Sequence, residues 1–460
     1  MFGETLEQFR DFSLYSELRL HRNISRRVSL LNGNMINNSL SAQSGVSARV
    51  YQGGLYGFAS APSEEESAVR AVLKEAEENA RFLAAREPAA KPALPKIARY
   101  SDPLRPDAAD DALPQKALAE FITAVDEYIA KKYPDLLSRV VTVNSLSMEK
   151  ELKTSDLVYA HSFTPRSFVI VSLTAADREG NPVELYELYG GYGLFSETQT
   201  SPEALFGKID ELYEMLMRKK EGVYAEPGIK NCILAPDLAG ILAHEAVGHT
   251  VEADFVQSGS VAGPNLGKQV ASELVTLVDF AHTALGEQCP VPVYTDDEGT
   301  PAKDAVIIDR GILCGFLHNK ESAQTYGVSP TGNARAFLFS DEPLIRMRNT
   351  AILPGKDKLE DMIAAIDDGY YFIRTGNGQA DATGEFMFGV TMGYEIRNGK
   401  LGRALRDTTI SGVAFDMLKT VDMLSDDMLW TCGGMCGKKQ PIPVGMGGPA
   451  IKCRINVGGR

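Results

Sequence analysis

The sequence lacks any apolar run that approaches the ~20 residues needed to cross a bilayer. Its first residues, MFGETLEQFRDFSLYSELRL, carry early acidic side chains and no apolar stretch, so we expect no secretory signal. Cysteine is scarce, because six residues in a chain of 460 do not make a disulfide scaffold. Together these absences predict a cytoplasmic protein with no membrane partner.

Basic residues are also fewer than acidic residues. The chain has 47 Lys and Arg against 61 Asp and Glu, which gives a net charge of −14 and a pI near 5.1. Basic clusters such as Arg26-Arg27 and Arg218-Lys219-Lys220 are two or three residues long. Because an acidic surface repels a phosphate backbone, we predict no direct nucleic-acid binding.

The length exceeds what one hydrophobic core usually serves, and the pattern predicts three units. Residues 1–95 and 107–224 each combine strands with amphipathic helices, so we expect an N-terminal and a central α/β domain. Five prolines within residues 86–106 predict an extended linker. Residues 228–460 are Gly-rich, with hairpin turns between alternating strands, which predicts a largely antiparallel, β-rich domain. The expected fold class is α+β.

A helix over residues 236–255 is expected to follow a buried strand, and it contains the motif HEAVGH. His244-Glu245 matches the start of H-E-x-x-H, but the second histidine, His249, comes one residue late. On a regular helix these two imidazoles would point roughly 140° apart, too far to share one metal. A π-bulge would bring the fifth residue back over the first, and Gly248 makes such a distortion easier.

A zinc site of this kind needs a third protein ligand and an open position. The stretch TCGGMCGKKQPIPVG supplies two candidates, Cys432 and Cys436, each followed by a glycine that allows close approach. Glu245 cannot reach the metal as the histidines do, but its carboxylate could take a proton from water. The residues are therefore compatible with metal-assisted hydrolysis, and ordinary helix histidines stay open as the alternative interpretation.

The motif HEAVGH, the distant CGK that begins at Cys436, and the PVG run resemble the TldD/PmbA family of metallopeptidases. The segments TDDEGTPAKDAVIIDRGILCGFLHN, TGNAR, RMRNT and TGEFMFGV resemble family segments in family order, so the likeness covers nearly the whole chain. The resemblance implies Zn²⁺ held by His244, His249 and Cys436, with Cys436 favoured over Cys432. It also implies Glu245 as the catalytic residue.

The same resemblance implies cleavage of short or unfolded peptides bound in an extended form. It further implies a dimer, formed either with a second copy or with a paralogue that lacks the histidine motif. Members of this family have also been labelled modulators of DNA gyrase, so a non-catalytic regulator with a structural metal is the alternative function. A hydrolase of non-peptide substrates is a third interpretation.

Other polar residues carry two interpretations each. His318 either polarises a scissile carbonyl or is a plain loop histidine. Arg346 and Arg348 either bind a peptide carboxylate or face solvent. Glu252 and Asp254 either orient an imidazole or solvate the end of the helix. Four cysteines in apolar or strand-like runs are expected to be buried small hydrophobes: Cys232, Cys289, Cys314 and Cys453.

Overall fold

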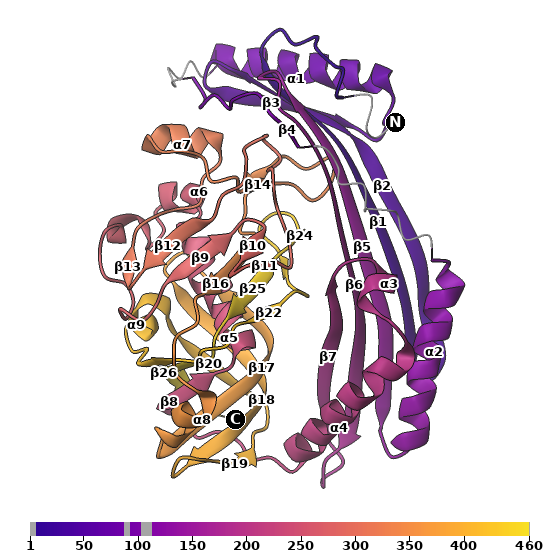
Figure 1. The fold of residues 1–460 in the computed structure, drawn as a ribbon, viewed down its shortest axis with the longest axis vertical. Coiled ribbons are helices and arrows are strands. Elements are labelled where there is room, and N and C mark those ends of the chain that lie inside the picture. The colour runs from indigo at the N-terminus through magenta and orange to yellow at the C-terminus, as the bar shows by residue number, and fades with distance from the viewer. Residues whose placement is uncertain (1–5, 87–92, 103–112, 460) are drawn as a thin grey trace.

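The computed structural model describes residues 6–86, 93–102 and 113–459, which form two lobes (Figure 1). A long curved sheet dominates the N-terminal lobe, and the C-terminal lobe packs along its concave side. Much of the linker predicted over residues 86–106 lies outside the described residues. Within the described ranges, no helix has the length and hydropathy required to cross a membrane.

The curved sheet has seven strands, and almost all of its pairs are antiparallel. In sheet order they are β3 (Leu55–Ala61), β2 (Asn34–Gln52), β1 (Tyr15–Leu31), β5 (Ser138–Thr154), β6 (Tyr159–Ala176) and β4 (Ser101–Asp102), with β7 (Pro182–Tyr192) also paired to β6. The turns at Asn32-Gly33 and Gly53-Gly54 have positive φ, as a two-residue hairpin turn requires. Strands from residues 1–95 and from 107–224 thus share one sheet.

Three helices cover this sheet because each has an apolar stripe at helical spacing. They are α1 (Glu66–Arg86), α2 (Gln115–Lys132) and α4 (Phe206–Lys220). Helix α1 buries Val69, Val72, Ala76 and Ala80 against β2 and β3. Helices α2 and α4 cover the other end of the sheet, where they contact β1 and β5, and β6 and β7, respectively.

The C-terminal lobe is built on two sheets. A closed ring of five strands forms a barrel: β17 (Asp368–Ala380), β8 (Gly228–Leu234), β26 (Ile451–Val457), β20 (Thr408–Val413) and β18 (Glu385–Arg397). The second sheet contains, in order, β13 (Ile312–Leu313), β12 (Ala305–Asp309), β9 (Leu277–Phe280), β16 (Asn349–Ile352), β25 (Gly445–Gly448) and β22 (Leu429–Thr431). Most pairs are antiparallel, and only β8–β17 and β16–β25 run parallel among those in these two sheets. The described chain is therefore a mixed α+β structure.

The helix that follows β8 packs between the barrel and the second sheet. Its elements are, in chain order, α5 (Pro236–Ile241), a π-helical turn η2 (Leu242–Gly248), a 3₁₀ turn η3 (His249–Val251) and α6 (Ala253–Gln257). The sequence predicted one helix through Phe255, but the helix breaks at Glu252, whose backbone is extended. The Leu317 amide donates to the Val251 carbonyl, and the Leu317 carbonyl accepts from the Ala253 amide. These strand-like bonds replace the helical bonds at this point.

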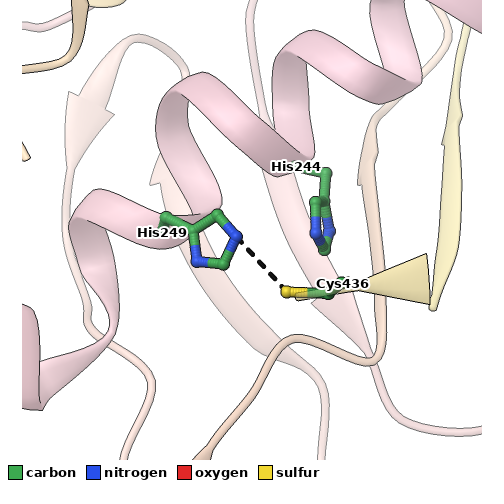
Figure 2. Close-up of side chains that lie close together, drawn as sticks. All are labelled: His244, His249 and Cys436. Atoms are coloured by element: carbon green, nitrogen blue, oxygen red, sulfur yellow. Dashed lines mark hydrogen bonds between the residues drawn. The ribbon is translucent and has the colours of Figure 1, made fainter. Parts of the chain in front are cut away.

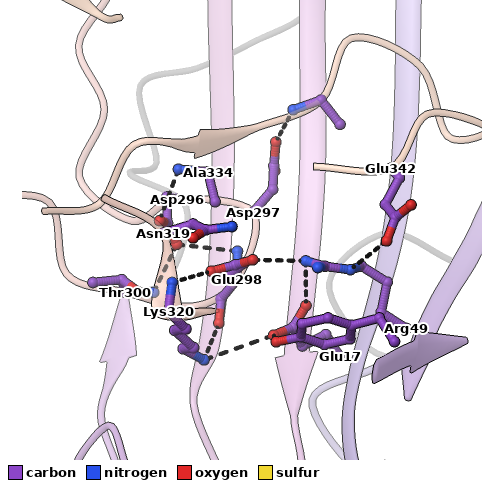
Figure 3. Close-up of polar contacts among 12 residues, drawn as sticks. Glu17, Arg49, Asp296, Asp297, Glu298, Thr300, Asn319, Lys320, Ala334 and Glu342 are labelled. Atoms are coloured by element: carbon purple, nitrogen blue, oxygen red, sulfur yellow. Dashed lines mark hydrogen bonds and ion pairs between the residues drawn. The ribbon is translucent and has the colours of Figure 1, made fainter. Parts of the chain in front are cut away.

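A buried ionic cluster joins the two lobes (Figure 3). Arg49 of β2 lies 3.2 Å from Glu17 of β1 and 2.7 Å from Glu298 in a loop of the C-terminal lobe. Lys320 donates to the Glu298 carbonyl and to the Tyr15 hydroxyl. Because buried charges are tolerated only when they are paired, this cluster fixes where the loop sits against the sheet.

Candidate metal centre

Three side chains from two distant parts of the chain meet between the lobe's sheets (Figure 2). The candidate ligand atoms of His244, His249 and Cys436 all lie within 4.8 Å of one another. The Cys436 sulfur is 3.3 Å from Nε2 of His249. The backbone amide of His249 donates to the carbonyl of His244, which is the i→i+5 bond of a π-turn. The π-bulge that the sequence required is therefore present, and it brings both imidazoles to one side.

Gly248 is needed for a different reason from the one the sequence suggested. Its backbone is ordinary right-handed helix, with φ −54° and ψ −46°, so it uses none of glycine's extra freedom. A Cβ at this position would instead lie 1.9 Å from the sulfur of Met347, which is fully buried. Glycine therefore permits the close packing of the π-turn against the segment that leads into β16.

The cysteine belongs to a short hairpin formed by β23 (Met435–Cys436) and β24 (Ile442–Pro443). Arg346 is fully buried and donates to the Cys436 carbonyl at 2.7 Å and to the Gln440 carbonyl at 2.8 Å. Cys432 lies outside this group, because its sulfur contacts the carbonyl of Gly190 in β7 at 3.5 Å. Of the two cysteines considered from the sequence, only Cys436 meets the histidines.

The electrostatics of the group fit a metal cation. His244 is fully buried, and within the described residues neither of its ring nitrogens has a hydrogen-bond partner. A buried polar group without a partner is costly, and a bound cation would satisfy it. Burial opposes ionisation of the Cys436 thiol, but the His244 and His249 imidazoles beside it lower its pKa to about 3. Two imidazoles and one thiolate are a donor set that suits zinc.

Two glutamates flank the group. The Glu245 carboxylate lies 3.9 Å from Nε2 of His244 and 3.7 Å from Nε2 of His249, and 29% of its side chain is exposed. It is therefore an acid that faces both the candidate metal position and solvent. Glu252 is fully buried, and its carboxylate lies 2.9 Å from Nδ1 of His249. It fixes the ring so that Nε2 points at the sulfur, as the first of the two interpretations expected.

Lys438 is a supporting residue that the sequence indicated only as part of a motif. Its Nζ lies 3.3 Å from the Glu252 carboxylate and 2.6 Å from the Asp254 carboxylate, over the face of Phe255. Asp254 thus acts through the lysine and does not contact an imidazole. The lysine neutralises part of the negative charge that the buried Glu252 brings toward His249.

The remaining candidates lie outside the His-His-Cys group. His318 is buried, its Nδ1 is 3.1 Å from the Ser322 hydroxyl, and burial lowers its pKa to about 4. Arg348 is fully buried and pairs with Asp279 at 2.8 Å. Neither Arg346 nor Arg348 faces solvent, so that expectation is wrong. Both guanidinium groups are committed to protein partners and hold the second sheet and the cysteine hairpin together.

The cysteines without a proposed role divide into two kinds. Cys232, Cys289 and Cys453 are buried, as predicted. Cys314 is exposed, so its predicted burial is wrong. It follows Leu313, which is buried, and strand alternation therefore turns Cys314 outward.

The fold and the site together define a mixed α+β protein whose C-terminal lobe carries a candidate metal centre on a π-helical turn. Two family models match the chain: the PmbA/TldA metallopeptidase C-terminal domain over residues 227–459 and the PmbA/TldA metallopeptidase domain 1 over residues 16–80. The chain belongs to the PmbA/TldD metallopeptidase family.

Curated relatives are similar over different lengths. A metalloprotease TldD homolog of Buchnera aphidicola is 39% identical over 49% of this chain and 47% of its own. A zinc metalloprotease TldD homolog of Saccharolobus solfataricus is 34% identical over 55% of this chain and 56% of its own. The chain thus spans about half the length of these relatives, whereas a Methanocaldococcus jannaschii metalloprotease matches at 29% identity over 98% of both chains.

Solved structures share the fold. TldE from Thermococcus kodakarensis superposes with a TM-score of 0.77 at 18% identity and covers 97% of both chains. A Thermotoga maritima protein, described by a proposed role as modulator of a DNA gyrase, gives a TM-score of 0.77 at 20% identity over 96% of both chains. At these identities the likeness concerns the fold alone.

Proposed function

We propose that this chain is a zinc-dependent metallopeptidase of the HExxxH type that hydrolyses short or unfolded peptides. The observation that carries the proposal is the convergence of His244, His249 and Cys436 beside the carboxylate of Glu245. The family membership and the name of the Saccharolobus solfataricus relative agree with zinc and with proteolysis.

Each residue of the metal centre has a separate role in the proposed hydrolysis. His244, His249 and Cys436 would hold the zinc, which when bound supplies Lewis-acid activation of water and of the scissile carbonyl. Glu245 accepts a proton from the attacking water, holds it on a carboxylate oxygen and delivers it to the leaving amine. Glu252 keeps the His249 ring oriented through the bond to Nδ1.

We propose that the substrate binds in an extended form. Within the described residues, β23 pairs only with β24, and Met435 beside the candidate ligand is exposed. A peptide that added a strand to β23 would gain backbone hydrogen bonds with loose side-chain selection, which favours unfolded chains.

The proposal includes three units over 1–95, 107–224 and 228–460, a cytoplasmic location, and a homodimer or a heterodimer with a motif-lacking paralogue.

The direct test replaces the proposed base with its neutral counterpart. Glu245→Gln keeps the side-chain volume, so the variant should bind zinc as the parent does. Its cleavage of an unstructured peptide should fall by roughly 10²–10⁴-fold, the usual contribution of a positioned acid–base group. Glu120→Gln, on the exposed side of α2, is the matched control and should cleave normally. Cleavage by Glu245→Gln at the parental rate would reject the assigned base.

Metal removal separates this proposal from a non-catalytic regulator with a structural metal. Chelation should abolish peptide cleavage and leave the melting temperature nearly unchanged, because most residues of the two largest cores lie outside the π-turn and the cysteine hairpin. A collapse in melting temperature, with no cleavage detected in the zinc-loaded protein, would favour the regulator.

A further inference from the structure

A cavity of about 400 Å³ lies between the curved sheet and the C-terminal lobe, apart from the metal ligands. One wall comes from β5 and β6, and the opposite wall from residues 288–297 with Arg335 and Pro443. Pro443 lies in β24, directly opposite Met435 in the hairpin that carries Cys436. The volume falls in the range of small-ligand pockets. The cavity therefore borders the metal-bearing hairpin and has room for the end of a short peptide.

Two buried arginines line this cavity without an acidic partner among the described residues. Arg166 of β6 is 7% exposed and donates to the carbonyls of Cys432 at 2.5 Å and Gly434 at 3.4 Å. Arg335 is 6% exposed and donates to the carbonyls of Met347 at 2.6 Å and Pro443 at 2.8 Å. Each guanidinium has five N–H donors, so these bonds leave donor capacity on both groups.

The acids in the cavity wall already accept hydrogen bonds, and Figure 3 shows two of them, Asp296 and Asp297. Asp102 accepts from the Thr295 hydroxyl at 3.3 Å. Asp297 accepts from Lys150 at 2.6 Å and from the amide of Ala336 at 2.7 Å. Asp296 accepts from the backbone amides of its own loop, and Glu197 accepts from the amide of Leu194 at 2.7 Å. Arg166 and Arg335 are therefore buried cations of the wall that lack an ion pair within the described part of the chain, whereas the acids of the wall all accept hydrogen bonds. Burial of two such cations is expensive unless an anion joins them.

The rest of the lining indicates what kind of anion fits. Much of it is apolar: Met148, Leu152, Phe163, Pro290, Pro292 and Tyr294. An inorganic ion would leave these side chains without contacts, whereas an apolar group ending in a carboxylate would satisfy both parts of the wall. Arginine is suited to such a group because its planar fork matches carboxylate geometry.

We propose that this cavity binds the carboxylate end of a peptide, with Arg166 and Arg335 supplying the charge. The inference rests on the proposed function for the identity of the ligand as a peptide. It adds a substrate preference: peptides with a free C-terminal carboxylate bind better than amidated ones. Both arginines also donate hydrogen bonds to backbone carbonyls within residues 432–443, the segment that contains Cys436. A peptide bound in the cavity would therefore lie against this segment.

The test measures binding to the full chain after zinc removal, so that no probe is cleaved. The probes are acetyl-Leu-Leu-Leu with a free carboxylate, the same peptide as its amide, and acetyl-Leu-Leu-Glu-amide, which carries the acid on a side chain. By titration calorimetry the free acid should bind at least about tenfold tighter than the amide, the loss expected for one charge-assisted hydrogen bond. Equal binding of the free acid and the Glu amide would assign the site to any carboxylate rather than to the chain end, and would overturn the terminal preference.

Variants locate the site. Arg166→Gln keeps a polar amide but lacks the charge, and it should remove the preference for the free acid. Arg335→Gln should do the same, and Arg166→Lys should retain part of the preference even if the glutamine variant fails to fold. Arg178→Gln is the control, because this arginine is 84% exposed and does not line the cavity.

The outcomes separate this inference from the proposed function. Equal affinity for acid and amide, or a preference that survives in folded Arg166→Gln and Arg335→Gln, overturns the inference even if zinc-dependent cleavage is found. A preference that depends on both arginines supports it even if the Glu245→Gln test rejects the assigned base.

Discussion

Gly248 offers the sharpest test of how packing sets the geometry of the metal centre. In Gly248→Ala the new Cβ would lie 1.9 Å from the Met347 sulfur, whereas ordinary contacts begin near ~3.5 Å. Met347 is fully buried and cannot swing into solvent, so it or the π-turn must shift by more than about 1.5 Å. Such overpacking costs about 1–3 kcal/mol, and the better helix propensity of alanine returns about 1 kcal/mol. We expect a net loss of up to about 2 kcal/mol, together with weaker zinc binding.

Urea unfolding measures the stability, and competition with a chromogenic chelator measures the zinc affinity. Gly207→Ala is the matched control, because this glycine lies in α4, where an added Cβ would meet nothing within 4 Å, and the variant should not lose stability. Met347→Ala removes the obstacle, so the double variant should be more stable than the sum of the two single changes by about 1–2 kcal/mol. A Gly248→Ala protein with parental stability and zinc affinity, and no coupling to position 347, would refute the steric explanation.

Three further predictions follow from the site and the lobe interface. Cys436→Ser should abolish stoichiometric zinc binding and Cys432→Ser should leave it intact, as metal analysis after gel filtration would show; the reverse result would exchange their roles. Glu252→Gln removes the negative charge beside Nδ1 of His249 and should weaken zinc affinity by about 10–100-fold in chelator competition. Unchanged affinity would show that this glutamate serves only the stability of the fold. Burial alone would raise the pKa of Asp297, but Lys150 and its other cationic neighbours lower it from 3.8 to about 2. This carboxylate should therefore stabilise the fold above about pH 4 and lose that effect as the pH falls toward 2, by on the order of 2 kcal/mol. Urea unfolding of the parent and of Asp297→Asn should converge over that range, and a constant difference would contradict the assignment.

The arginines that sequence reasoning misplaced or missed share a cause. Arg346 and Arg348 were expected either to bind a peptide carboxylate or to face solvent. Both are fully buried, since they bridge backbone carbonyls and an aspartate that come from distant segments. Arg166 gave no local signal at all, because its partner Cys432 lies 266 residues away. Partners that are this far apart cannot be read from spacing along one helix or strand.

Local patterns were read more successfully. The hairpin turns at Asn32-Gly33 and Asn398-Gly399 were predictable because few residues accept positive φ, and both occur. The amphipathic helices α1, α2 and α4 followed from apolar spacing alone. The break at Glu252 was missed because it depends on Leu317, which pairs with the backbone on either side of it.

By itself the sequence determined the turns, the amphipathic helices, and the need for a π-bulge if His244 and His249 were to share a ligand, because these follow from backbone sterics and helical periodicity. The family resemblance favoured Cys436 over Cys432, but only the tertiary structure places the Cys436 sulfur with the histidines and turns the Cys432 sulfur toward β7, because their positions depend on how the hairpin packs. It also decided that Gly248 serves close packing against Met347, because a contact between separate segments leaves no mark in the local pattern.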